Sequence, residues 1–334
     1  MKKFCIALAL SAGACAVASA ADSGYKPGYK LGYKLGQQLV LGKKTKWDYA
    51  AIDQVRHRLF VTRGDHVDVL DLLSGKQIGA VTQTNGVHGV AFAQDLKLGF
   101  TSNGKTNSVS VFDLETLATV GEIALTGKNP DAILYEPSVK KLYVFNGGSK
   151  NVDIVDATSR KVIGTVQATG TPEFAVSDER GKIYFNIEDN AGINVIDATS
   201  NKRLAAWKLD KCEEPTGLAI DVLHNRLFST CQNGIMAVTD TLTGKRVGQF
   251  AIGAGPDAAA YDAESGTVFT SGGGGNGSLT ITHQEDANHY APSDTLVTAQ
   301  GARTMAMDTT TKRVYLPTVT GEQFIVLVVE PLSK

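Results

Sequence analysis

The stretch Val152-Asp153-Ile154-Val155-Asp156-Ala157-Thr158-Ser159-Arg160-Lys161 decides the fold, because versions of it recur along the chain. Clear copies of its β-branched, apolar run ending in a carboxylate lie at 67–71, 109–113 and 193–197, and weaker ones follow at 236–240, 279–283 and 326–330. The last residues of successive copies are 42, 43, 41, 43, 43 and 47 positions apart. A fixed period of this size, built from short strand-like segments, is typical of propellers and solenoids.

Each repeat divides into four strand-like runs. In the third repeat these runs are 131–135, 141–145, 151–156 and 161–166, rich in β-branched and aromatic residues and separated by Gly, Asn, Asp, Pro and Ser. Four antiparallel strands per repeat predict a propeller blade, whereas an immunoglobulin-like sandwich would not recur as a four-strand unit. The sequence therefore predicts an all-β, seven-bladed β-propeller.

The two ends of the chain predict how the ring closes. The seventh repeat supplies three strands and ends at 326–330 without a fourth. Residues 38–41 have the character of the missing strand and precede the first blade. An N-terminal strand that completes the last blade would remove two open sheet edges, which otherwise invite aggregation.

The N-terminal residues indicate export. Lys2 and Lys3, a short apolar run and Ala18-Ser19-Ala20 predict a signal peptide over residues 1–20, cleaved before Ala21. A leader of Gly-Tyr-Lys repeats follows at 21–36, which we expect to be flexible, and the propeller spans 37–334. No later segment is long and apolar enough to span a membrane, so we expect a periplasmic or secreted protein.

Charge and cysteines narrow the function classes further. Without residues 1–20 the chain has 31 basic and 34 acidic residues, a net charge of −3, and no basic run. Nucleic-acid binding needs a basic face, so we do not expect it. Cys212 and Cys231 are the two cysteines that remain, and an even pair in an oxidising compartment predicts a disulfide.

The repeat also resembles a known family. Its carrying features are the strand Leu142-Tyr143-Val144-Phe145-Asn146, the Asp-x-x-Ser/Thr turn at 156–161, and Pro-Asp or Pro-Glu at 130–131, 172–173 and 256–257. The chain resembles the YVTN-repeat β-propellers, and within them the secreted YncE-like proteins, over residues 32–334. The resemblance implies the fold; it says little of function, because this fold serves binding proteins, surface proteins and some enzymes.

Known catalytic motifs do not survive a test of context. Gly272 to Gly277 matches the spacing of a dinucleotide-binding loop, but a strand-like run at 278–282 follows where that loop needs a helix. The sequence has no His-Glu-x-x-His and no Gly-x-Ser-x-Gly.

The most suggestive constellation comes from aligning the repeats on their first strand. One position per blade then carries, in order, Asp48, His88, Asp131, Glu173, Thr216, Asp257 and Arg303. In a propeller these residues begin the innermost strands, so we expect a ring at the mouth of the central channel, with Arg63 and His66 in a neighbouring loop. Such a ring could bind a ligand or a divalent cation. Alternatively, the repeated acid only stabilises its own turn.

From these observations we expect a non-catalytic binding or scaffold protein, a monomer, whose small-molecule or protein partner binds at the channel mouth. The alternative is a lactonase-like hydrolase with His88, Glu173 and Arg303 as its catalytic candidates, because propeller lactonases use the same residue types at a channel mouth. No cofactor is identified from the sequence, and the identity of a metal stays open.

Overall fold

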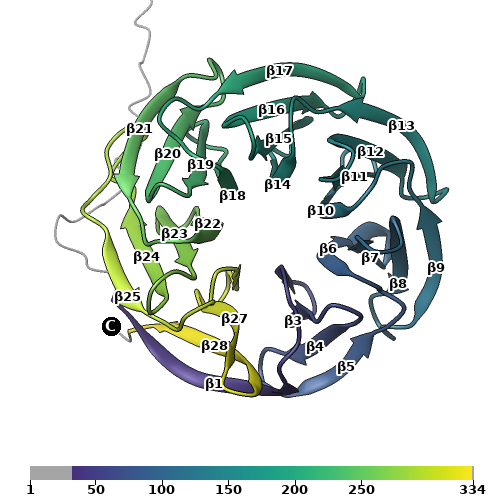
Figure 1. Cartoon of the computed structure of the whole chain (residues 1–334), viewed down its shortest axis with the longest axis horizontal. Coiled ribbons are helices and arrows are strands. Elements are labelled where there is room, and N and C mark those ends of the chain that lie inside the picture. The colour runs from purple at the N-terminus through teal and green to yellow at the C-terminus, as the bar shows by residue number, and fades with distance from the viewer. Residues whose placement is uncertain (1–31, 333–334) are drawn as a thin grey trace, which may run out of the picture. The chain divides into compact units, whose positions relative to one another are not determined.

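The computed structural model describes residues 32–332; the predicted signal peptide and residues 21–31 of the leader lie outside this part of the chain. The described chain is an all-β propeller of seven four-stranded antiparallel sheets, with one short 3-10 turn, η1 (Gln94–Leu96). Figure 1 shows the sheets as blades arranged in a ring, with the first strand of each of blades two to six innermost. The sequence-based prediction of the fold is confirmed.

Consecutive strands form blades one to six. Blades one to three consist of β2 (Ala50–Asp53), β3 (Arg58–Thr62), β4 (Val67–Asp71), β5 (Gln77–Val81); β6 (Val87–Ala93), β7 (Leu98–Asn103), β8 (Ser108–Asp113), β9 (Thr119–Ala124); and β10 (Pro130–Glu136), β11 (Lys141–Asn146), β12 (Asn151–Asp156), β13 (Lys161–Gln167). Blades four to six consist of β14 (Pro172–Ser177), β15 (Lys182–Ile187), β16 (Gly192–Asp197), β17 (Lys202–Lys208); β18 (Pro215–Asp221), β19 (Arg226–Cys231), β20 (Ile235–Asp240), β21 (Arg246–Ala251); and β22 (Pro256–Asp262), β23 (Thr267–Gly272), β24 (Ser278–His283), β25 (Asp294–Val297). Because β24 follows the glycine loop, that loop lacks the helix a dinucleotide site needs.

Blade seven joins the two ends of the chain. Its strand order is β1 (Tyr33–Lys43), β28 (Gln323–Pro331), β27 (Val314–Thr320) and β26 (Ala306–Met307). The first strand pairs antiparallel with the last, as predicted, with Leu39 opposite Val326. It begins at Tyr33 rather than at 37, so residues 33–36 are strand and not flexible leader. The Tyr33 ring packs edge-on against Phe269 of blade six, 5.3 Å between centroids, which extends the pairing toward the N-terminus.

The repeated aspartate after the third strand of a blade has a local structural role. The carboxylate of Asp156 accepts a hydrogen bond from the backbone N–H of Ser159 at 2.6 Å, and Asp197 does the same with Ser200. These bonds close the tight turn to the outermost strand and lower the pKa of Asp156. The Asp-x-x-Ser/Thr signature is therefore explained by turn chemistry.

The core lies between neighbouring blades. Second and third strands are buried almost throughout, and their largest side chains, such as Tyr143 and Phe185, are fully buried. Aromatic rings of adjacent blades touch directly: the centroids of Phe145 and Phe185 are 5.0 Å apart. The closed ring thus buries a face of every blade, which a single blade could not do alone.

The disulfide predicted from the sequence is present. Cys212 lies in the loop before β18 and Cys231 ends β19, and their sulfurs are bonded, with Cα atoms 5.2 Å apart. Among residues 32–332, no helix is long and apolar enough to cross a membrane.

Candidate functional site

A cavity of about 480 Å³ opens where the innermost strands begin. It is lined by Asp48, Tyr49, Asp131, Glu173, Glu188, Thr216, Gln232, Gly255, Asp257, Gly273, Gly274, Gly301 and Arg303. Six of the seven positions aligned from the repeats therefore share one cavity. The seventh, His88, contacts two of the six through ion pairs.

A bulge in the first strand of a blade sets the direction of the ring side chains. In blade three the pairing with β11 is regular up to Ile133 and then jumps to Pro130, so Asp131 lies inside the irregular segment. The same shift surrounds Glu173 in blade four and Thr216 in blade five. Bulges release residues from the regular alternation of a strand, and here they leave the side chains free to face the channel.

Hydrogen bonds from the preceding blade fix the backbone of the ring residues. The Ser102 hydroxyl donates to the carbonyl of Asp131, and the Ser271 hydroxyl donates to that of Arg303. The Thr304 hydroxyl bonds the Asp48 carbonyl at 2.8 Å, and the Asn186 amide bonds the Thr216 carbonyl at 2.9 Å. The ring is consequently held by contacts between blades.

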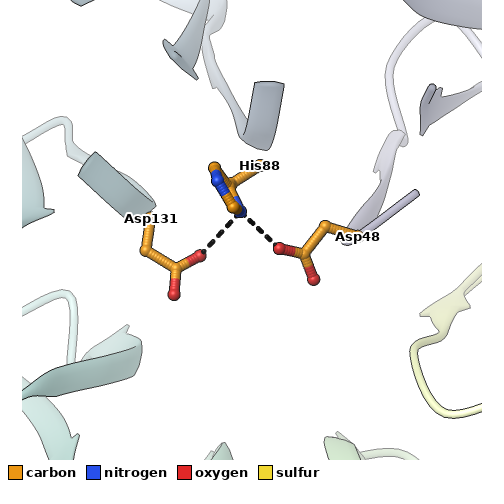
Figure 2. Close-up of side chains that lie close together, drawn as sticks. All are labelled: Asp48, His88 and Asp131. Carbon is orange, nitrogen blue, oxygen red and sulfur yellow. Dashed lines mark hydrogen bonds and ion pairs between the residues drawn. The ribbon is translucent and has the colours of Figure 1, made fainter. Parts of the chain in front are cut away.

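His88 lies between two carboxylates of neighbouring blades, as Figure 2 shows. Its Nδ1 is 2.6 Å from Oδ2 of Asp48 and 3.5 Å from Oδ1 of Asp131. The pKa of His88 is raised: burial lowers it, but the hydrogen bond to Asp48 and the charges of both aspartates outweigh burial. His88 therefore favours its charged form in this position.

Arg303, from blade seven, contacts the ring residues of the two neighbouring blades. Its Nε donates to Oδ2 of Asp257 at 2.7 Å, and a second guanidinium nitrogen lies 3.7 Å from Oδ1 of Asp48. The guanidinium also lies 5.6 Å from the centre of the Trp47 ring. Asp48 thus has one carboxylate oxygen toward Arg303 and the other toward His88.

Four carboxyl groups of the cavity have raised pKa values. Burial, then the charges of Glu214 and Asp189, raises the pKa of Glu188. Burial, then the charge of Asp131, raises the pKa of Glu173 to about 10. Burial and Asp48 raise that of Asp131 to about 7, although His88 opposes the shift. Burial raises the pKa of Asp257 to about 6, with Arg303 opposing it. The cavity is therefore a place where negative charge is incompletely compensated.

Two residues that we grouped with the channel mouth lie elsewhere. Arg63 is 4% exposed and ion-paired with Asp68 at 2.5 Å, and it donates to the carbonyls of Leu41 and Lys43. It connects blade one to the closing strand β1. His66 pairs with Asp65 at 2.7 Å, and neither His66 nor Arg63 lines the cavity. The loop after β3 turns toward the closing strand rather than toward the channel.

Other cavity residues were not predicted as part of the site. Tyr49 follows Asp48 and is buried; burial and Asp131 raise its pKa well above the usual value. Other blades carry Gly, Ala, Phe or Thr after the ring residue, so the tyrosine at this position was a readable signal. Gln232, which donates to the carbonyl of Pro256 at 2.9 Å, had no such signal.

Comparisons with known proteins agree with the fold. No family model matches the chain. A stretch of 165 residues, 48% of the chain, is 25% identical to the Antigen Lp49 of Leptospira interrogans serogroup Icterohaemorrhagiae serovar copenhageni (strain Fiocruz L1-130) and covers 36% of that protein. The chain thus spans little more than a third of this relative's length.

Solved structures resemble the chain over nearly its whole length. The structure titled "Crystal Structure of Mitotic Checkpoint Complex" matches with a TM-score of 0.78 at 14% identity, over 97% of this chain and 100% of its own. The "Structure of U3-55K" matches with 0.75 at 9% identity, over 90% and 98%. The "Crystal structure of RRP9 WD40 repeats" matches with 0.77 at 8% identity, over 90% and 97%. At these identities the likeness is one of fold, and the propeller fold is one that commonly serves binding.

Proposed function

We propose that this protein is a binding protein that captures a small cation, inorganic or organic, at the mouth of its central channel. The observation that carries the proposal is the charge balance of the cavity. Five of its lining side chains are carboxylic acids, at 48, 131, 173, 188 and 257, and one is a cation, Arg303. With His88 added, the acids still outnumber the cationic groups.

A confined group of carboxyls resists ionisation until a cation enters. Glu173, with its pKa of about 10, stays protonated at pH 7 in the empty cavity. A positive ligand beside it would favour the ionised form, so binding should release protons. The excess of carboxylates would repel an anionic ligand, which argues against nucleic acid and acidic peptides as occupants of the mouth.

We further propose that the protein acts in the periplasm or outside the cell. The disulfide supports an oxidising compartment, where such bonds persist. The predicted signal peptide agrees with this location, and so does the resemblance to the secreted YncE-like branch of the YVTN-repeat propellers. N-terminal sequencing of the exported protein should give Ala21 as its first residue.

Calorimetric titration tests the function. Divalent metal salts, primary amines and diamines, and matched carboxylic acids of the same size are titrated into the protein at low ionic strength. At least one cation should bind one to one, and the acids should not. Asp257→Asn should weaken binding of that cation. Asp178→Asn, which removes an acid in the turn between β14 and β15, should not. Binding of the acids but of no cation would refute the proposal.

A lactonase-like hydrolase is the second candidate. The observation that favours it is the 2.6 Å contact between His88 and Asp48 next to Arg303, which offers an Asp–His pair for proton transfer and a guanidinium that could polarise a carbonyl. However, His88 Nδ1 already contacts carboxylates, and the side chain is not among those lining the cavity. Hydrolysis of simple lactones that His88→Ala abolishes would favour the enzyme over the binding protein.

A further inference from the structure

We propose that Asp48, His88 and Asp131 form a binding site for one divalent transition-metal ion of the zinc type. The inference rests on the proposed function, since it names the cation that the channel mouth takes. It assigns the metal to the first three blades of the ring and leaves the rest of the cavity, including the glycines, open to a further ligand.

The three side chains offer converging ligand atoms. One imidazole nitrogen and one oxygen from each aspartate all lie within 4.8 Å of one another, and the side chains are partly buried. Nδ1 of His88 is 2.6 Å and 3.5 Å from the two carboxylate oxygens. A zinc ion needs nitrogen and oxygen ligands at about 2.0–2.2 Å. It could take the place between these atoms with small movements of the side chains (Figure 2).

A second observation points to a missing partner. Oδ1 of Asp131 is completely buried and accepts no hydrogen bond. It faces His88, but the 3.5 Å contact is an ion pair without a hydrogen bond, because Nδ1 donates its hydrogen bond to the nearer Asp48. An unsatisfied buried carboxylate oxygen is costly, and a metal ion at its position would satisfy it.

The environment of the three ligands suits a metal site. Asp48 is oriented by Arg303, 3.7 Å from Oδ1, which leaves Oδ2 directed at His88. The backbone of Asp131 is held by the hydroxyl of Ser102. Contacts of this kind orient the ligands of metal sites. Three protein ligands on one side would leave a coordination position directed at the cavity, as in zinc sites that bind a further molecule.

The ligand types select among metals. Imidazole nitrogen suits zinc and its neighbours, whereas calcium takes six to eight oxygen ligands and magnesium keeps most of its waters. His88 is the only histidine among the seven ring positions, and it stands where four other blades carry Asp or Glu. We therefore expect Zn²⁺ to bind more tightly than Ca²⁺ or Mg²⁺.

The test is calorimetric titration of ZnCl₂, with MgCl₂ and putrescine as comparisons, into the chelator-treated protein free of any polyhistidine tag. His88→Gln and Asp131→Asn should each lower the affinity for zinc more than tenfold. Asp178→Asn, which removes an acid outside the cavity, should change the affinity for zinc less than threefold. Exposed His–Asp pairs, such as His289 with Asp286 at 2.7 Å, could bind zinc weakly, so His289→Gln serves as the background control. Circular dichroism melts check that every variant is folded.

The outcomes separate the two proposals. One-to-one zinc binding that is lost in His88→Gln and Asp131→Asn, and kept in Asp178→Asn, supports the metal site. Zinc binding that both ligand variants retain would overturn it. If zinc fails to bind but putrescine binds, and Asp257→Asn weakens putrescine, the metal inference is overturned while the proposed function stands. If neither ion binds, both are overturned.

Discussion

Replacing Glu173 by glutamine should stabilise the protein at neutral pH. In the folded protein the pKa of Glu173 is about 10, raised by burial and then by Asp131, against 4.5 for an unperturbed glutamate. At pH 7 the unfolded chain therefore ionises this group while the folded chain keeps its proton. The difference costs about 1.4 kcal/mol for each pH unit between 4.5 and 7, or about 3 kcal/mol in all.

The sign follows from the direction of the shift. A raised carboxyl pKa means that the folded state holds the proton more tightly. The contribution of Glu173 to the free energy of unfolding is therefore greatest below pH 4.5 and declines as the pH rises toward 10. Glutamine carries no such proton and mimics the neutral acid. The free energy of unfolding of Glu173→Gln should then exceed that of the wild type by up to about 3 kcal/mol at pH 7 and equal it near pH 4.

Urea unfolding of chelator-treated protein at both pH values measures this difference. Glu122→Gln, at an exposed position of the outermost strand β9, is the matched control and should change stability by less than about 0.5 kcal/mol at either pH. If Glu173→Gln destabilises at pH 7, or shifts stability equally at both pH values, Glu173 is not held neutral by burial and the neighbouring acids.

Three further changes test other parts of the structure. A chain that begins at Gly32 should unfold cooperatively, whereas one that begins at Lys44 lacks β1, exposes the edge of β28 and should aggregate or lose cooperativity; identical melts would refute closure by this strand. Cys212→Ser with Cys231→Ser opens a loop whose ends are 19 residues apart and should cost about 3 kcal/mol in urea unfolding, so unchanged stability would show that the bridge adds nothing. Arg303→Ala should cost about 1–2 kcal/mol at pH 8 and less at pH 5, where Asp257, with its pKa near 6, is protonated; a pH-independent loss would place Arg303 outside the charge balance of the ring.

The repeat made the fold predictable, because each copy has the same order of strand-like runs and turn residues. The same regularity gave the ring: one aligned position per blade was enough to bring distant residues such as Asp48 and Asp257 to one cavity. The closing strand was readable from the missing fourth strand of blade seven. Its start at Tyr33 was not, because that start depends on a tyrosine packing against Phe269, a contact between residues far apart in the sequence.

Side-chain direction was the least predictable property of the site. Arg63 lies after a strand that ends near the channel, yet it pairs with Asp68 and donates to carbonyls of residues 41 and 43. The two carbonyls reach Arg63 only once the N-terminal strand has closed the ring, so the local sequence does not reveal these contacts. The pairing of His88 with two neighbours likewise depends on bulges in adjacent blades, which the sequence does not specify residue by residue.

The most direct test of cation binding at the channel mouth is a crystal structure of the zinc-soaked protein, with diffraction data collected above the zinc absorption edge. The account predicts one strong anomalous peak bonded to Asp48, His88 and Asp131 at about 2.0–2.2 Å. A second crystal soaked with putrescine reports on the organic alternative. A mouth that holds only water in both crystals would contradict the central claim.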